Sequence, residues 1–168
     1  MEFNEYMIKR KKSAALKLLS FLIYFIATIL ALLSLVLLLR YSGIGLLVAV
    51  AFYYFAHKIS SQMNKEFEYI RTEDILDVDV IINKTKRKRL ISFSVKNAEI
   101  IASLNNASYN ERLKKSFSKV IDATSGHRDA NVYFAIIEDK NTLVKFEPTF
   151  AILTNLQVYA PSKVIIDE

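Results

Sequence analysis

The two histidines are the first residues to consider for catalysis or metal binding, because imidazole serves both roles near neutral pH. His57 follows an uncharged stretch, and His127 lies in segment 125–129, which also holds a serine and an aspartate. A catalytic triad is defined by geometry across separate segments, so this closeness in sequence does not predict one. The chain has two histidines and no cysteine, which is a poor ligand set for a transition metal. We therefore expect no metal site, and we interpret His127 as a loop residue.

Asp77 and Asp79 are the next candidates, because two carboxylates on one strand face lie about 7 Å apart. Such pairs can carry out acid–base chemistry. Here they alternate with Val78 and Val80, which is typical of the wet face of an antiparallel strand. The three glycines, at positions 43, 45 and 126, cannot form a glycine-rich phosphate loop. The sequence contains no nucleophile–base constellation, so it predicts a protein that is not an enzyme and has no cofactor.

The densest group of charges is basic. Five of the 23 Lys and Arg residues fall in the segment NKTKRKRL, at Lys84, Lys86, Arg87, Lys88 and Arg89. These five are candidate contacts for anionic lipid headgroups or for a protein partner. The alternative is a solvated turn between strands, whose cations keep a strand edge from pairing with other chains. Nucleic acid is not expected, because residues 58–168 hold 17 basic and 15 acidic side chains, a net of +2, without a wider basic face.

Two apolar runs precede this cluster. Residues 18–39 contain no charge, and a helix of 22 residues rises about 33 Å, enough for a hydrocarbon core of about 30 Å. Residues 41–56 form a shorter uncharged run, which Lys58 can extend by snorkelling. We predict a transmembrane hairpin with spans at about 14–39 and 44–62; a re-entrant or protein-buried helix is the alternative for the second run. The first run is too long for a signal-peptide core of about 7–15 residues.

The flanking cations predict the orientation of the spans. Lys and Arg are abundant at positions 9–12, whereas the connection between the runs has only Arg40. By the positive-inside rule, this distribution predicts a multi-pass protein of the cell membrane with both termini in the cytoplasm. The basic cluster then also lies in the cytoplasm, where each cation near an anionic headgroup contributes about 1 kcal/mol.

The remaining sequence predicts a small β domain. Alternation of apolar and polar residues predicts strands at 66–71, 77–83, 90–95 and 99–104, joined as consecutive antiparallel hairpins. A short amphipathic helix is expected within 105–119, a short strand after it, and a hairpin from 131–137 and 142–147. Pro148 suits the first turn of a helix, whose apolar stripe is Ile152, Leu153, Leu156 and Tyr159 and which Pro161 ends. The prediction is an α+β chain: residues 1–62 form a basic flank and membrane hairpin, and residues 63–168 form an antiparallel β domain capped by a C-terminal helix.

Three stretches of the sequence resemble a family. They are Phe67-Glu68-Tyr69, the segment LDVDVIINKTKRKRL at 76–90, and Phe146-Glu147-Pro148. The chain is similar over nearly its full length to an uncharacterised bacterial family of two-span membrane proteins with a pleckstrin-homology-like (PH-like) cytoplasmic domain. It departs from the family pattern at Glu73-Asp74, where a glycine-containing turn is usual. The resemblance implies the fold but carries no functional residue, because the family has no established activity.

Together these features predict a membrane-anchored cytoplasmic PH-like interaction module, apposed to anionic lipid through its basic cluster. The alternative is a structural subunit of a larger membrane complex that binds protein partners or further copies of itself. In that case small residues such as Ala27, Ala31 and Ser34 would pack on partner helices. Otherwise we expect these three side chains to face lipid.

Overall fold

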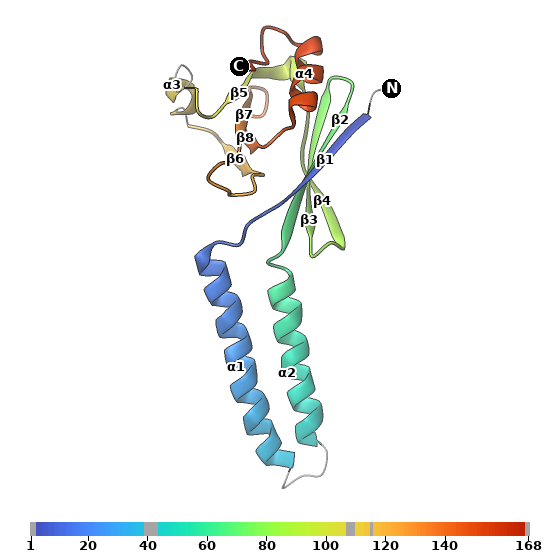
Figure 1. Ribbon diagram of the computed structural model, residues 1–168, viewed down its shortest axis with the longest axis vertical. Coiled ribbons are helices and arrows are strands. Elements are labelled where there is room, and N and C mark those ends of the chain that lie inside the picture. The colour runs from blue at the N-terminus through green and yellow to red at the C-terminus, as the bar shows by residue number, and fades with distance from the viewer. Residues whose placement is uncertain (1–2, 39–43, 107–109, 115, 167–168) are drawn as a thin grey trace. The chain divides into compact units, whose positions relative to one another are not determined.

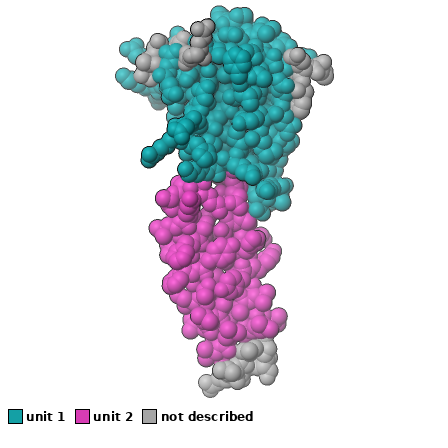
Figure 2. Space-filling view, viewed as in Figure 1, with its two compact units in different colours: residues 1–11, 66–168 teal, residues 12–65 magenta. Residues whose placement is uncertain are grey.

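The computed structural model describes residues 3–38, 44–106, 110–114 and 116–166. The chain divides into two compact units (Figure 2). One unit is continuous and spans Lys12–Lys65. The other combines Met1–Lys11 with Glu66–Glu168, so the N-terminal segment belongs with the C-terminal domain.

The continuous unit is a pair of helices, α1 (Ala14–Leu38) and α2 (Ile44–Ser61), which pack side by side (Figure 1). Both are long and apolar enough to cross a membrane, as predicted. The residues buried between them are small, which lets the two backbones approach closely: Ala27, Ala31 and Ser34 from α1, and Gly45, Ala49, Ala56 and Ser60 from α2. The expectation that Ala27, Ala31 and Ser34 face lipid or a partner was therefore wrong, because α2 covers them.

The first sheet of the other unit contains a strand that the sequence analysis missed. Its order is β1 (Phe3–Lys9), β2 (Lys65–Thr72), β3 (Ile75–Ile82) and β4 (Lys86–Ser94). Strand β1 pairs antiparallel with β2, with Tyr6 opposite Tyr69 and Lys9 opposite Glu66. Its partner follows both apolar helices in the sequence, so no local hairpin signal marks it. The two helices are thus inserted between neighbouring strands of one sheet.

The second sheet has the order β5 (Ala98–Ser103), β7 (Tyr133–Ile137), β8 (Thr142–Phe146) and β6 (Lys119–Asp122). The β7–β8 hairpin confirms the prediction, and β6 runs parallel to β8. The expected hairpin between β4 and β5 is wrong. A 3-10 turn at Val95–Asn97 redirects the chain after β4, so that β5 pairs with β7. The Ser94 hydroxyl caps this turn by accepting the Lys96 N–H.

The expected helix in 105–119 is short in the described residues, with only α3 (Asn110–Leu113) helical. Leu113 and Phe117 nevertheless have the role that their spacing predicts. They pack against the outer apolar side chains of the second sheet, a small cluster of Ile100, Ala102, Phe134, Ile136 and Leu143.

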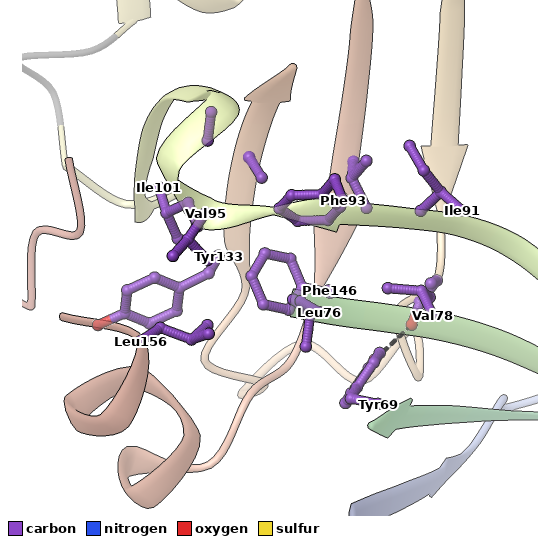
Figure 3. Packing of buried hydrophobic residues seen from close by; sticks show 14 of the residues in the cluster. Tyr69, Leu76, Val78, Ile91, Phe93, Val95, Ile101, Tyr133, Phe146 and Leu156 are labelled. Atoms are coloured by element: carbon purple, nitrogen blue, oxygen red, sulfur yellow. Dashed lines mark hydrogen bonds between the residues drawn. The ribbon is translucent and has the colours of Figure 1, made fainter. Parts of the chain in front are cut away.

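The main core lies between the two sheets and under α4 (Phe150–Tyr159) (Figure 3). It contains Phe67, Tyr69, Leu76 and Val78 from the first sheet, Tyr133 and Phe146 from the second, and Ile152, Leu153 and Leu156 from the helix. The predicted helical stripe is therefore confirmed, except that Tyr159 is 37% exposed. Pro148 lies before the helix rather than in its first turn, because the Thr149 hydroxyl caps it by accepting the Ile152 N–H.

Candidate functional site

The basic cluster begins in a tight turn and continues along a strand. Asn83 and Lys84 have φ angles of 52° and 57°, and the Thr85 N–H donates to the Ile82 carbonyl at 3.1 Å. Positive φ at both central residues is typical of the two-residue turns that suit the twist of a hairpin. Only Lys84 among the five cations lies in this turn; Lys86 and the three that follow it are in β4.

A β-bulge decides which way these side chains point. Val78 pairs with Ile91, but the next residue, Asp79, pairs with Arg89, so Leu90 is the extra residue on β4. Before the bulge, Ile91 shares the core face with Val78. After it, the alternation has shifted by one residue, so that Arg89 joins the face of Asp79 instead of entering the core.

The two arginines of the cluster are engaged within the sheet. Arg89 bonds Asp79 through Nε at 2.9 Å and Asp77 through an Nη atom at 2.9 Å. Arg87 reaches Glu68 on β2, with Nη2 at 2.6 Å from Oε1. Both guanidinium groups are about half exposed, whereas the Glu68 side chain is fully covered and Asp79 nearly so. These contacts hold three strands together across the outer face of the first sheet.

Glu68 is the most perturbed carboxyl of this network. Burial raises the pKa of Glu68 above its ordinary value, and a hydrogen bond with Glu5 acts in the same direction. The neighbouring Arg87 guanidinium opposes this shift. Within this network the covered Glu68 therefore binds a proton more readily than an exposed glutamate, and Arg87 counteracts this tendency.

The three lysines differ from the arginines. Lys84, Lys86 and Lys88 are exposed, and within the described part of the chain they make no ion pair. We call them the lysine patch. Lys86 lies opposite Ile82, and Lys88 lies opposite Val80, so both lie on the core-facing side of β4 near its start, although both are exposed. The alternating acids on β2 and β3 indicate that some cations of the cluster are paired, but the bulge on β4 decides which ones.

The lysine patch lies at one particular end of the first sheet. Strand β2 starts at this end, because the two-residue turn Glu73–Asp74 reverses the chain and β3 returns to the turn at 83–85. Strand β1 finishes there too, since Lys9 pairs with Glu66. The chain thus leaves the sheet for the apolar helices, and comes back from them, at the end that carries the lysine patch (Figure 1).

The family described as Bacterial PH-like domain (DUF6106) matches residues 2–166, which includes β1, both helices and both sheets. The chain belongs to this family. No curated protein and no solved structure gave a significant match. PH-like domains are generally non-catalytic interaction modules, and the family has no assigned function.

The late Phe-Glu-Pro motif is structural in this PH-like domain. The Phe146 ring meets the Tyr69 ring edge-on, with centroids 6.0 Å apart. The Glu147 carboxylate accepts both the N–H and the hydroxyl of Ser125, at 2.7 and 3.0 Å. The Tyr69 hydroxyl donates to the Ala123 carbonyl at 2.5 Å, so the motif fastens the loop after β6 to both sheets.

This fastening also accounts for the serine near His127. The Ser125 hydroxyl donates to Glu147 and accepts the backbone N–H of His127 at 3.2 Å, so it is not directed at the imidazole. In the residues that the structure describes, no cluster of three metal-ligating side chains occurs. The turn where the chain departs from the family pattern places Glu73 at a φ of 55°, a conformation in which glycine is unstrained.

Proposed function

We propose that this protein is a membrane-anchored, non-catalytic interaction module, with its PH-like domain in the cytoplasm and the lysine patch against anionic lipid headgroups. The observation that carries the proposal is the position of the patch: three exposed lysines lie at the sheet end where both connections to the apolar helices leave.

Short connections support this assignment. Residues 10–13 separate β1 from α1, and residues 62–64 separate α2 from β2. An extended chain covers at most about 3.6 Å per residue, so three residues hold the start of β2 within roughly 14 Å of the end of α2. This tether keeps the lysine patch at a high effective concentration near any headgroup layer at that helix end.

The strength of the contact follows from the number of unpaired cations. A basic side chain near an anionic surface contributes about 1 kcal/mol, so the lysine patch contributes about 3 kcal/mol. Arg87 and Arg89 add less, because carboxylates of the same sheet already neutralise them. A soluble domain would bind anionic lipid only weakly with this energy. A tethered domain is already at the membrane, so it needs only enough binding energy to fix its orientation.

The absence of cysteine allows a direct test on the full chain. The exposed Thr85, at the tip of the patch, is changed to Cys and labelled with a fluorophore; Asp139 in the β7–β8 turn gives a matched label site. The protein is reconstituted into neutral or anionic vesicles containing a headgroup quencher. A membrane-impermeant thiol reagent applied to intact cells first tests the orientation, and it should leave both positions unlabelled.

We expect quenching at position 85 in anionic vesicles, reduced by salt and by the triple substitution Lys84→Gln, Lys86→Gln and Lys88→Gln. The control variant carries Gln at Lys114, Lys119 and Lys140, which removes the same charge elsewhere on the domain. Equal quenching at positions 85 and 139, or no dependence on lipid charge, would contradict lipid docking.

A further inference from the structure

Glu68 is a covered carboxyl that contacts two side chains of opposite charge. Its Oε1 accepts from Arg87 Nη2 at 2.6 Å, and its carboxyl shares a hydrogen bond with the carboxyl of Glu5 on β1. The Glu68 side chain is fully covered, whereas Glu5 is exposed and the Arg87 side chain is 53% exposed. Glu68 is therefore the buried centre of a group whose other two members reach solvent.

The contact with Glu5 depends on a proton. An ionised carboxylate only accepts hydrogen bonds, so two carboxyl groups bond to each other only when one of them retains its proton. The contact with Arg87 has the reverse requirement, because a guanidinium group binds an ionised carboxylate more strongly than a neutral carboxyl. Uptake of a proton by Glu68 thus strengthens its link to Glu5 and weakens its hold on Arg87.

The neighbouring strands leave Arg87 as the cation in contact with Glu68. The two-residue turn Glu73–Asp74 brings Glu68 level with Asp79 on β3, and a carboxylate at this position disfavours ionisation of Glu68. Arg89 is already bonded to the aspartates of β3. The charged side chains that the neighbouring strands place around Glu68 on this face are Glu5 and Lys9 from β1, Asp77 and Asp79 from β3, and Arg87 and Arg89 from β4.

The contact with Glu68 also turns Arg87 away from the lysine patch. Arg87 lies opposite Ile81. Glu68 is level with Asp79, two residues farther from the turn at 83–85. Two strand residues span about 7 Å, so the Arg87 side chain runs back along the sheet to reach Glu68. A released guanidinium group is free to extend toward the end of the sheet that carries the lysine patch.

We propose that Glu68 is a proton switch for lipid docking, because its protonation releases Arg87 to join the lysine patch against anionic headgroups. The switch rests on the proposed function, since the release of Arg87 matters only where this end of the sheet meets lipid. Acid strengthens docking, and a rise in pH returns Arg87 to Glu68. One further cation at an anionic surface raises the ratio of docked to undocked domain about fivefold.

The test uses the full chain labelled on Cys at Thr85, in vesicles that contain the headgroup quencher. The anionic lipid is phosphatidylglycerol, whose phosphodiester keeps its charge over a pH series that starts above the ordinary pKa of a glutamate. We expect quenching to rise as the pH is lowered. Glu68→Gln imitates the protonated carboxyl and still donates to Glu5, so it should remove this rise and give strong docking throughout. The control Glu66→Gln removes a carboxyl from the same face of the same strand and should keep the rise.

Arg87→Gln is the second variant, and without a guanidinium group to release it should also lose the rise. The two histidines gain charge in acid as well, but every variant keeps them, so only the part that Glu68→Gln removes is assigned to Glu68. Docking that does not vary with pH, or an equal rise in the unmodified chain and in either Glu68→Gln or Arg87→Gln, would overturn the switch and leave lipid docking itself standing. Absence of quenching at every pH, in the unmodified chain and in Glu68→Gln, would overturn lipid docking and the switch with it.

Discussion

Because β1 pairs with β2 in the first sheet, we expect residues 62–168 alone to form an incomplete domain. That fragment lacks the strand that covers the free edge of β2, although it contains every residue of the domain that the sequence alone predicts. Ile8 is 8% exposed in the intact unit and packs with Phe67 in the main core. Removing β1 forfeits this burial, about 2–3 kcal/mol, and it also uncovers part of Phe67 and Tyr69. The expected loss is at least about 3 kcal/mol, a large part of a typical stability of 5–15 kcal/mol.

The comparison needs a soluble chain that keeps β1. Residues 3–11 are joined to residues 65–168 through a flexible Gly/Ser linker of about eight residues, long enough to return from Lys11 to Lys65. Arg10 and Lys11 are kept because they bond Asp122 at 3.0 Å and the Ser125 carbonyl at 2.7 Å. In urea, with a slope of about 1.5 kcal/mol per molar, the linked chain should unfold about 2 M later than the fragment.

A control separates the strand from the mere presence of extra residues. Ile8→Asp in the linked chain keeps the length and composition but places a charge in the core, so its midpoint should fall to that of the fragment. Equal midpoints for the fragment and the unmodified linked chain would refute the reasoning, because β1 would then contribute nothing to the stability of the unit.

Three further outcomes are expected in the linked chain. Arg89→Ala leaves the nearly buried Asp79 without its partner, so it should lower the free energy of unfolding by about 1–2 kcal/mol. The control Lys88→Ala should change the free energy of unfolding by less than about 0.5 kcal/mol. Equal losses for the two variants in urea titrations would contradict the pairing of Arg89 with Asp79. Tyr69→Phe removes the buried hydroxyl that donates to the loop after β6 and should cost about 1–3 kcal/mol by the same titration. The raised pKa of Glu68 means that the folded state holds a proton more tightly than the unfolded state, so this carboxyl's contribution to stability falls as pH rises from its ordinary pKa through the raised one. Glu68→Gln should flatten that fall at pH values above the ordinary pKa of a glutamate, and an unchanged pH profile would assign the fall to other groups.

Much of the fold follows from the period of the apolar residues. The helices and the strands after them were predictable because each has a local pattern of adequate length, and the β7–β8 hairpin closes over a four-residue turn. Strand β1 was not predictable in this way. It alternates Tyr6 and Ile8 with Glu5 and Met7, but its partner β2 is separated from it by two helices, and sequence pattern carries no record of distant pairing.

The candidate site shows the same limit at the level of single side chains. Five adjacent cations are visible in the sequence, but their different environments depend on the bulge opposite Val78 and Asp79. Strict alternation would place Arg89 on the core face with Ile91. The extra residue Leu90 shifts the register, so the arginines meet acids from two other strands and only the lysines remain available. A bulge is a property of a strand pair, so one strand's sequence does not reveal it.

The insertion of both helices between β1 and β2 also sets an order of events during synthesis. Strand β1 leaves the ribosome first, yet residues 10–65 must be made before β2 can receive it. At roughly 5–20 residues per second, this takes about 3–11 s, during which β1 is an unpaired segment with open backbone groups. Its pairing with β2 brings the two ends of the helix pair together at one edge of a sheet. Closure of the PH-like domain is therefore coupled to completion of the helical hairpin, and a chain whose hairpin fails to form carries its defect into the fold of this domain.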